Sequence, residues 1–435
     1  MSTWLLVAGC SDDAPAPDAG VPDAFMRPPD AAVCMPGCEG DMLRLCDPDE
    51  VLTPCALGCN AEGPACFELV PQNGANQGHL NDVDADLVIP AGVLGHIDTD
   101  TGEILVNSAI VRRDGLGVVN GIGYYGLPDD IAVLSVNSLS VAGGARLRLT
   151  GTRALIILSA DAVFIAGVID VAAGCDGDGR AHCAGPGGGN GSTNNGTQAQ
   201  GCAPGGNGGG GLVLTDETGG GGGGFGSDGA PGGDGGDRGG GIAGLVNGSG
   251  CVGPELVPLS GGSGGGAGGL DSDGGDGGGG GGAVQITSFT SITMAGAPGE
   301  CGVDAGGAGG RGGESDDGGG GGGSGGAILL EAPIINLDAA ILAANGGGGG
   351  GGGGNAEGNR AEDGVFGARQ AQGGGNGGAG ASSAGPAVAG TSGGDNTGGG
   401  GGGTGYIRLV VPETALTIDN AVVSPAFLRD DLILQ

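Results

Sequence analysis

Runs of glycine alternate with short apolar segments along this chain, and this alternation limits what it can fold into. The stretch from Gly318 to Gly354, GGGGGGSGGAILLEAPIINLDAAILAANGGGGGGGGG, places an apolar segment between two such runs. Of 435 residues, 116 are Gly, far above the average share of about 7%. Collagen would need Gly at every third position and abundant Pro, whereas these runs are unbroken and only 22 Pro are present. The core must therefore come from the intervening Val, Ile, Leu and Ala.

Four apolar segments share one pattern, in which apolar residues occupy alternate positions. The segments begin at Ala154, Ala283, Ala327 and Tyr406. Their alternating residues are Leu155 and Ile157 with Val163 and Ile165; Val284 and Ile286 with Ile292 and Met294; Ile328 and Leu330 with Ile335 and Leu337; Ile407 and Leu409 with Leu416 and Ile418. A period of two predicts β-strands with one buried face. Two short strands joined by a short corner fit the sides of one coil of a stacked structure.

One coil without an insertion can be read before the glycine runs begin. Leu139-Ser-Val141-Ala-Gly recurs as Val163-Phe-Ile165-Ala-Gly, and Val141 and Ile165 are 24 positions apart (165 − 141). That interval is in the range of known structural repeats. The later segments begin at irregular intervals, so we expect coils that stack while Gly-rich loops of different length leave from one corner.

The Gly-rich loops are expected to be partly mobile tethers. Ordering a backbone residue costs about 1–2 kcal/mol, and Gly costs more than most residues. Loop-closure entropy depends only logarithmically on length, so deleting five of the nine Gly from 346 to 354 should change stability by less than about 1 kcal/mol. The alternative is that neighbouring polyglycine strands pack together through mutual hydrogen bonds.

The cysteines indicate an oxidising compartment. Six lie close together with no His among them: Cys34, Cys38, Cys46, Cys55, Cys59 and Cys66. This pattern predicts three disulfides rather than a zinc site, with the pairing open among 15 possibilities. Five more lie in Gly-rich segments: Cys175, Cys183, Cys202, Cys251 and Cys301. Because five is odd, one of them is expected to be free or to pair outside the chain.

The amino terminus contains Val7-Ala8-Gly9-Cys10, which resembles the lipobox of bacterial lipoproteins. The resemblance implies that Cys10 carries a lipid and that residues 1–10 hold the signal. Only nine residues precede Cys10, without Lys or Arg, whereas a signal peptide has a basic start and a longer apolar region. We therefore expect the true start codon to lie upstream. Residues 11–33, rich in Asp, Ala and Pro, are predicted to be a disordered tether.

The sequence thus predicts five successive regions. They are the lipoprotein signal with its lipidated Cys (1–10), the tether (11–33), a disulfide-rich module (34–67), a β-rich entry region (68–130) and the stacked coils with Gly-rich insertions (131–435).

The chain is strongly acidic, with 49 Asp and Glu against 14 basic residues and a net charge of −35. Such a chain repels phosphate backbones, so nucleic acid is not an expected partner. No segment approaches the roughly 20 apolar residues of a transmembrane helix.

The sequence offers candidate ligands for calcium. Carboxylates occur at calcium-like spacings at Asp98, Asp100 and Glu103, at Asp176 and Asp178, and at Asp271, Asp273 and Asp276. Ca²⁺ takes six to eight oxygen ligands, and none of these groups completes a known calcium loop, so solvated loop carboxylates are the competing interpretation. GxSxG around Ser263 and Ser324 is expected by chance in so Gly-rich a chain and indicates no nucleophile.

Together, the tether, the cysteine block and the Gly-rich strand repeats resemble Gly-rich surface lipoproteins predicted in myxobacteria. The Gly-rich half is similar to right-handed parallel β-helices of the pectin-lyase-like class. The resemblance implies an all-β fold, a right-handed parallel β-helix or solenoid with long Gly-rich loops, preceded by a small disulfide-rich module. Many β-helices of that class are polysaccharide lyases or hydrolases, for which the candidate residues would be Arg146, Arg148, Arg153, Asp161 and Asp170. In ARLRL, alternation points Arg146 and Arg148 outward, and ordinary outward polar residues are the competing interpretation.

The sequence as a whole favours a lipid-anchored structural or adhesive protein of a bacterial outer membrane or cell surface, without catalysis or cofactor. Its expected partners are the membrane, through the lipid, and extracellular polysaccharide or matrix. One alternative is a carbohydrate-active β-helix enzyme, which a convergent carboxylate–Arg cleft on one strand face would distinguish. The other is a Ca²⁺-dependent extracellular matrix protein.

Overall fold

The computed structural model describes residues 35–40, 42–46, 50–55, 57–174, 182–193, 197–208, 217–236, 238–246, 251–269, 273–354, 356–393 and 396–435. The chain divides into two compact units, Met1–Ala65 and Cys66–Gln435. Cys10, Cys34, Cys175, Asp176, Asp178 and Asp271 lie outside the described residues.

The first unit is a small antiparallel β-module. It contains β1 (Gly37–Glu39), β2 (Met42–Cys46), β3 (Glu50–Pro54) and β4 (Cys59–Asn60), with β5 (Ala65–Cys66) at the boundary. Strands β1, β2 and β3 form one sheet, and β4 pairs with β5. A disulfide joins Cys38 to Cys59, and Cys46, Cys55 and Cys66 are also disulfide-bonded. The predicted disulfides are therefore present among the described cysteines of this block.

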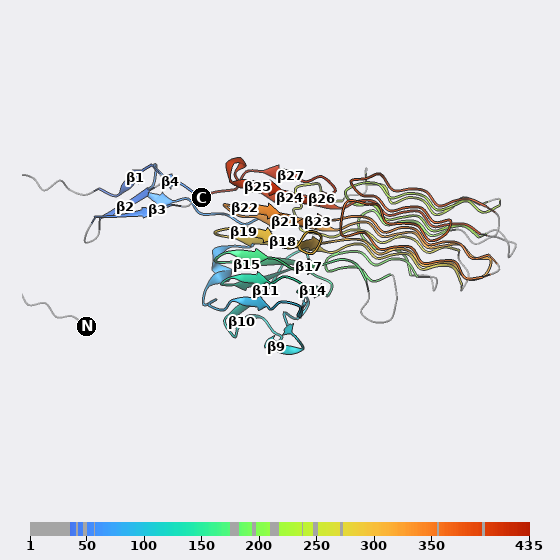
Figure 1. Cartoon of the computed structure of the whole chain (residues 1–435), viewed down its shortest axis with the longest axis horizontal. Helices are drawn as coiled ribbons and strands as arrows, with labels where there is room; N and C mark the ends of the chain where they lie inside the picture. The colour runs from blue at the N-terminus through green and yellow to red at the C-terminus, as the bar shows by residue number, and fades with distance from the viewer. Residues whose placement is uncertain are drawn as a thin grey trace, which may run out of the picture. The chain divides into compact units, whose positions relative to one another are not determined.

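Three sheets, parallel over most of their strands, make up the strand-rich part of the second unit (Figure 1). The first sheet contains, in spatial order, β10 (Gly117–Val119), β11 (Ile122–Leu127), β12 (Ile131–Val136), β15 (Ala154–Ser159), β18 (Ala283–Ser288), β21 (Ala327–Glu331), β24 (Tyr406–Val410) and β27 (Leu428–Asp430). The second contains β6 (Leu87–Ile89), β13 (Leu139–Val141), β16 (Val163–Ile165), β19 (Ile292–Ala295), β22 (Ile335–Asp338) and β25 (Leu416–Asp419). The third contains β9 (Ala109–Arg112), β8 (Ile104–Val106), β7 (Leu94–Asp98), β14 (Arg146–Thr150), β17 (Val168–Asp170), β20 (Gly302–Asp304), β23 (Ile341–Ala343) and β26 (Val422–Ser424).

Successive strands visit the three sheets in turn, so that each round of chain adds one strand to each sheet. Strands β12, β13 and β14 form one round, and β15, β16 and β17 pair with them in parallel. Val141 pairs with Ile165, which confirms the 24-residue interval, and Ala283, Ala327 and Tyr406 are register partners. Strands β6 and β7 already pair in parallel with β13 and β14, so the parallel sheets begin at Leu87, upstream of residue 131. Two short 3-10 helices are η1 (Gln77–Leu80) and η2 (Glu413–Ala415).

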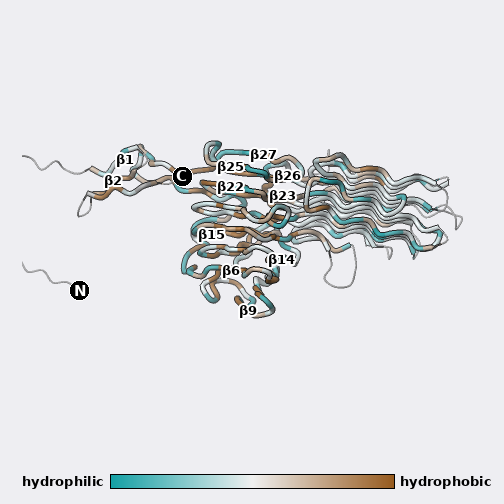
Figure 2. Tube along the Cα trace, in the orientation of Figure 1, coloured by the Kyte–Doolittle hydropathy of each residue, from teal (hydrophilic) through white to brown (hydrophobic). Residues whose placement is uncertain are grey.

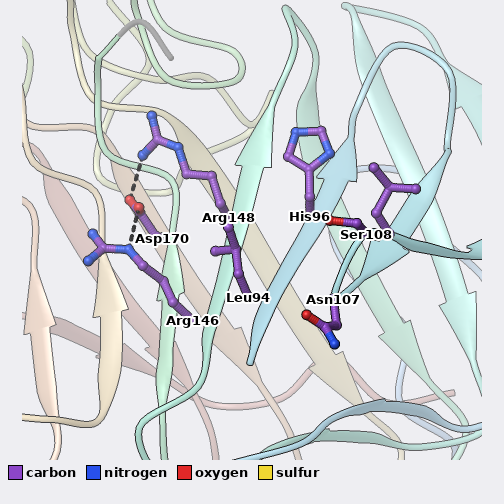
Figure 3. Close-up of a pocket in the computed structure, with 8 residues that line it drawn as sticks. Leu94, His96, Asn107, Ser108, Arg146, Arg148 and Asp170 are labelled. Atoms are coloured by element: carbon purple, nitrogen blue, oxygen red, sulfur yellow. Dashed lines mark hydrogen bonds and ion pairs between the residues drawn. The ribbon is translucent and has the colours of Figure 1, made fainter. Parts of the chain in front are cut away.

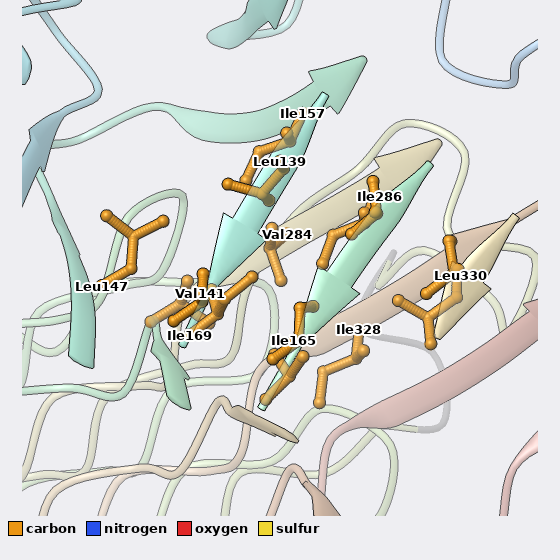
Figure 4. Packing of buried hydrophobic residues seen from close by; sticks show 14 of the residues in the cluster. Leu139, Val141, Leu147, Ile157, Ile165, Ile169, Val284, Ile286, Ile328 and Leu330 are labelled. Atoms are coloured by element: carbon orange, nitrogen blue, oxygen red, sulfur yellow. The ribbon is translucent and has the colours of Figure 1, made fainter. Parts of the chain in front are cut away.

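The alternating apolar side chains fill the space between the three sheets (Figure 4). Labelled members of this core are Leu139, Val141, Leu147, Ile157, Ile165, Ile169, Val284, Ile286, Ile328 and Leu330. Ile335 and Leu337 are buried in it as well, as the period-two pattern predicts. Each such side chain contributes roughly 1.5–3 kcal/mol when it is fully buried. Hydrophobic residues concentrate in the sheets, whereas the glycine runs are largely pale or teal in Figure 2.

All three long insertions leave the sheets at the same corner, as predicted. Residues 171–282, 305–326 and 344–405 each connect a strand of the third sheet to a strand of the first. Their described Gly-rich parts lie side by side in Figure 1 and are largely buried. We call these parts the glycine bundle. The expectation of partly mobile tethers is wrong for them, because they are packed against one another.

The segment 317–326 shows how the bundle is held together. Its N–H groups donate in rows that repeat every three residues. Gly319, Gly322 and Gly325 donate to the carbonyls of Thr397, Gly400 and Gly403; Gly320, Gly323 and Gly326 donate to those of Arg311, Ala308 and Ala305; Gly321 and Ser324 donate to those of Gly266 and Ser263. A repeat of three residues is that of the polyproline II helix, which makes no hydrogen bonds within itself.

The carbonyls of the same segment accept from three further neighbours. The donors are the N–H groups of Gly275, Gly278 and Gly281, those of Gly220 and Gly223, and those of Gly347, Gly350 and Gly353. The segment therefore donates hydrogen bonds to three neighbouring segments and accepts hydrogen bonds from three others. Satisfying both backbone groups in this way removes the cost of burying unpaired amides.

Close approach of the segments explains why the runs are glycine. A Cβ atom added to Gly322 would overlap the carbonyl oxygen of Gly347, and one added to Gly323 would overlap that of Gly279. The obstructing atoms belong to the backbone, so no side-chain rotation relieves the overlap. Shortening a run removes hydrogen bonds between neighbouring segments, such as that from the N–H of Gly350 to the carbonyl of Gly320. We therefore expect the deletion within 346–354 to cost more than 1 kcal/mol, contrary to the tether model.

Gly322→Ala should lower the free energy of unfolding by about 1–3 kcal/mol, the usual cost of overpacking a filled interior. The matched control is Gly143→Ala, because a Cβ atom at Gly143 meets nothing within 4 Å. Urea denaturation of both variants gives the comparison. Equal stability of the two variants would contradict a packed bundle.

Candidate functional site

The outer face of the third sheet carries a row of ionisable side chains. His96, Arg148, Asp170 and Asp304 are successive register partners on β7, β14, β17 and β20. Alternation along β14 sends Leu147 and Leu149 into the core and leaves the arginines outward, as the sequence predicts. Parallel pairing in register then places side chains from four neighbouring strands next to one another.

Asp170 links two arginines of the neighbouring strand (Figure 3). Its Oδ2 lies 2.7 Å from Nε of Arg146, and its Oδ1 lies 2.7 Å from Nη1 of Arg148. Oδ1 also accepts from the N–H of Ala172 at 3.0 Å. The Asp170 side chain is 4% exposed, whereas that of Arg146 is 54% exposed. Asp170 thus holds both guanidinium groups while one of them stays open to solvent.

A cavity of about 670 Å³ lies beside this cluster. Its lining residues are Leu94, His96, Leu105, Asn107, Ser108, Arg146, Arg148 and Asp170. We call it the third-sheet cavity. Its volume is in the usual range of small-molecule sites, about 300–1,000 Å³.

One wall of the cavity is the hairpin of β8 and β9. Its turn residues Asn107 and Ser108 have φ of 50° and 63°, the left-handed conformation that a two-residue hairpin turn requires. Arg112 anchors the base of this hairpin. It is fully buried and donates at 2.8 Å to the carbonyls of Gly102, Gly115 and Gly117.

His96 stands between the hairpin and the arginines in Figure 3. Its Nε2 lies 2.8 Å from Oγ1 of Thr150. Its Nδ1 is buried and has no hydrogen-bond partner in the described part of the chain. The Thr150 contact fixes the plane of the ring.

Asp304 extends the row beyond the cavity lining and is almost fully buried. Burial, and then the charge of Asp170, raises the pKa of Asp304 to about 7. The N–H of Gly306 donates to its Oδ1 at 3.1 Å and opposes that shift. Near neutral pH this carboxyl group is therefore only partly ionised.

The arrangement can bind an anion more readily than it can transfer protons. Glycoside hydrolysis uses one carboxyl as acid and a second as base or nucleophile. Here both oxygens of Asp170 bind arginine, and Asp304 is buried outside the cavity lining. The exposed guanidinium of Arg146 is the group best placed to meet a ligand.

The other predicted site residues lie elsewhere. Arg153 precedes β15, and Asp161 follows it and accepts from the N–H of Ala162 at 2.8 Å. Neither lines the third-sheet cavity, so of the five candidates for carbohydrate chemistry the structure brings together Arg146, Arg148 and Asp170.

Several calcium candidates already have protein partners. Asp98 Oδ1 accepts from the N–H groups of Asp100 and Thr101 at 2.8 and 3.1 Å. Asp100 accepts from Oγ1 of Thr152 at 2.8 Å, and Asp276 lies 3.8 Å from Arg311. Glu103 and Asp273 also lie in the described chain, where no three His, Cys, Asp or Glu side chains converge as a metal site would require.

The serines of the two GxSxG matches are buried within the glycine bundle. The N–H of Ser263 donates to Oγ of Ser324 at 2.8 Å, so these serines join two polyglycine segments. Of the later cysteines, Cys202 and Cys251 form a disulfide, Cys183 is disulfide-bonded, and Cys301 is the free, buried cysteine of the described chain. This agrees with the expectation that one of the five is free.

A second buried carboxyl, Glu331, lies on the outer face of the first sheet. It accepts from Nε2 of Gln285 at 2.6 Å and from Oγ1 of Thr287 at 2.8 Å. The N–H of Gln72 also donates to it, at 3.3 Å. Burial raises the pKa of Glu331 to about 7. Because segments distant in sequence supply these donors, we assign Glu331 a structural role.

Comparison with protein-family models, with curated proteins and with solved structures finds no match for this chain. Within the described residues, no helix is both long and apolar enough to span a membrane.

Asp304→Asn should make the free energy of unfolding fall less steeply as pH rises from about 4 to above 7. The pKa of Asp304 is higher in the folded than in the unfolded chain, so folding favours its protonated form. Its contribution is complete below pH 4 and is lost as pH rises through about 7. One pKa unit corresponds to about 1.4 kcal/mol, so the loss is on the order of a few kcal/mol.

Thermal or urea unfolding between pH 4 and 8 measures the effect. The variant should gain stability relative to the parent at pH 8 and little at pH 4. Glu331→Gln serves as the comparison, since Glu331 has a similar shift at a distant place. Parallel pH profiles for the parent and Asp304→Asn would rule out a raised pKa at this residue.

Proposed function

We propose that this chain is a lipid-anchored structural or adhesive protein of a bacterial outer membrane or cell surface. The observation that carries the proposal is the glycine bundle. It forms an extensive hydrogen-bonded framework from residues without side chains, which suits a framework for display better than a catalytic surface. The disulfides support export to an oxidising compartment.

We also propose that the three sheets form a right-handed parallel β-helix. Support comes from the regular visit of successive strands to the three sheets and from the shared apolar core. The right hand follows from the strong general preference for right-handed crossovers between parallel strands of one sheet.

A carbohydrate-active enzyme is the second candidate function. The cluster of Arg146, Arg148 and Asp170 beside a cavity is the feature that favours it. The pairing of both Asp170 oxygens with arginine favours binding over hydrolysis. Release of new reducing or unsaturated sugar ends from acidic polysaccharides, abolished by Arg146→Gln, would support the enzyme instead.

Cys10→Ser should move the protein from the membrane fraction to the soluble fraction of a bacterium that expresses its full precursor. Each buried CH₂ of an acyl chain contributes about 0.8 kcal/mol, so several chains give stable anchoring and their loss releases the protein. Cys301→Ala is the control, because it removes the buried free thiol and leaves Cys10 in place. If Cys10→Ser remains in the membrane fraction to the same extent as the parent, the anchoring proposal is wrong.

A further inference from the structure

The third-sheet cavity offers more positive than negative charge in an otherwise acidic protein. Arg146 and Arg148 face it with one carboxylate, that of Asp170, between them. Among the lining residues, two guanidinium groups and one carboxylate leave a single positive charge, and the partly ionised Asp304 lies just outside the lining. The chain as a whole has a net charge of −35, so the charge of the cavity lining is opposite in sign to that of the whole chain.

Arg146 has hydrogen-bonding capacity to spare. Its Nε is bound to Asp170, and within the described chain its two terminal nitrogens have no protein partner. Arg148 uses Nη1 on Asp170 and Nη2 on the carbonyl of Gly174, at 3.2 Å. Because Asp170 restrains Arg146 through Nε, the directions that its exposed terminal nitrogens can take are limited. Such a fork matches the two oxygens of a carboxylate.

Apolar side chains stand on the same lining. Leu94 is 59% exposed, Leu105 is half-buried, and both border the cavity with the Asn107–Ser108 turn. Figure 3 shows Leu94 on the strand beside Arg146 and Arg148. Covering an exposed leucine with an apolar group is favourable by roughly 25 cal/mol of free energy per Å² of apolar surface buried.

We propose that the third-sheet cavity binds a monocarboxylate with an apolar body. The carboxylate pairs with the terminal nitrogens of Arg146, and the body covers Leu94 and Leu105. A single negative charge matches the excess positive charge of the lining, whereas a phosphate dianion would add repulsion from Asp170 and Asp304. This inference rests on the proposed adhesive function and adds to it the class of ligand that the surface-anchored protein would bind.

Calorimetric titration of the full chain carrying Cys10→Ser tests the proposal at moderate salt. The probes are hexanoate, its uncharged counterpart hexanamide, glucuronate and inorganic phosphate. Hexanoate should bind best, and hexanamide should bind at least about tenfold more weakly, because it lacks a charge-assisted bond to Arg146. Raising the salt concentration should weaken hexanoate binding.

Two variants localise the site. Arg146→Gln should weaken hexanoate binding at least about tenfold, whereas Arg360→Gln should leave it unchanged. Arg360 is a matched control because it too is partly exposed and paired with one carboxylate, Asp363, but lies in the glycine bundle. Leu94→Glu alters an exposed side chain, should not disturb folding, and should abolish binding by repulsion. It keeps the test decisive if Arg146→Gln unfolds.

Several outcomes would overturn the proposal. The first group concerns the probes: no probe binds, hexanoate and hexanamide bind equally well, or glucuronate or phosphate binds more tightly than hexanoate. The other is that neither Arg146→Gln nor Leu94→Glu weakens hexanoate binding. Tighter glucuronate binding would indicate an acidic saccharide, and tighter phosphate binding a general anion site. The titration measures ligand binding by protein that lacks the lipid cysteine, so its result does not depend on anchoring. A negative titration would therefore overturn the ligand proposal alone, and a negative fractionation experiment would overturn the anchoring proposal alone.

Discussion

The backbone hydrogen bond between neighbouring polyglycine segments is the interaction on which this structure depends. In segment 317–326, N–H groups and carbonyls bind six surrounding segments in rows that repeat every three residues. Each bond contributes only about 1 kcal/mol net, yet a buried backbone group without a partner would cost more than that. Side chains are absent because the segments approach too closely for a Cβ atom, as at Gly322. The sheets supply a corner from which all these segments start and to which they return.

Strand positions were predictable because their physical signal is local. Period-two alternation identified the buried residues of the first three segments and Ile407 and Leu409 of the fourth, whereas Leu416 is only partly buried and Ile418 is exposed. The interval from Val141 to Ile165 gave the register between neighbouring parallel strands. The glycine runs were misjudged for a physical reason. Ordering entropy and loop closure are properties of one run, whereas the hydrogen bonds that hold the bundle form only between several runs, some parallel and some antiparallel. A single run such as 346–354 cannot order itself, so the decisive energy lies between runs distant in sequence.

The candidate site was predictable only in part, for a similar reason. Alternation in ARLRL placed Arg146 and Arg148 outward, and Asp170 lies on the next strand of the same sheet, so these three could be found. His96 could not be found in this way, because it lies in the region predicted only as β-rich and the parallel pairing of β7 with β14 leaves no local pattern. Asp304 was missed because its partner Asp170 lies across a long Gly-rich insertion. The register between parallel strands on either side of such an insertion is set by packing, which leaves no local pattern in the sequence.

Amide hydrogen exchange in the glycine bundle tests the central claim most directly. The account predicts that the amides of Gly319 to Gly326 exchange slowly, with protection comparable to that of strand β21, because their N–H groups are buried and bonded. Their protection should also be lost together with that of the neighbouring segments when the protein unfolds. Exchange of these amides at the rate of an unstructured chain, while β21 remains protected, would contradict the account and restore the model of mobile tethers.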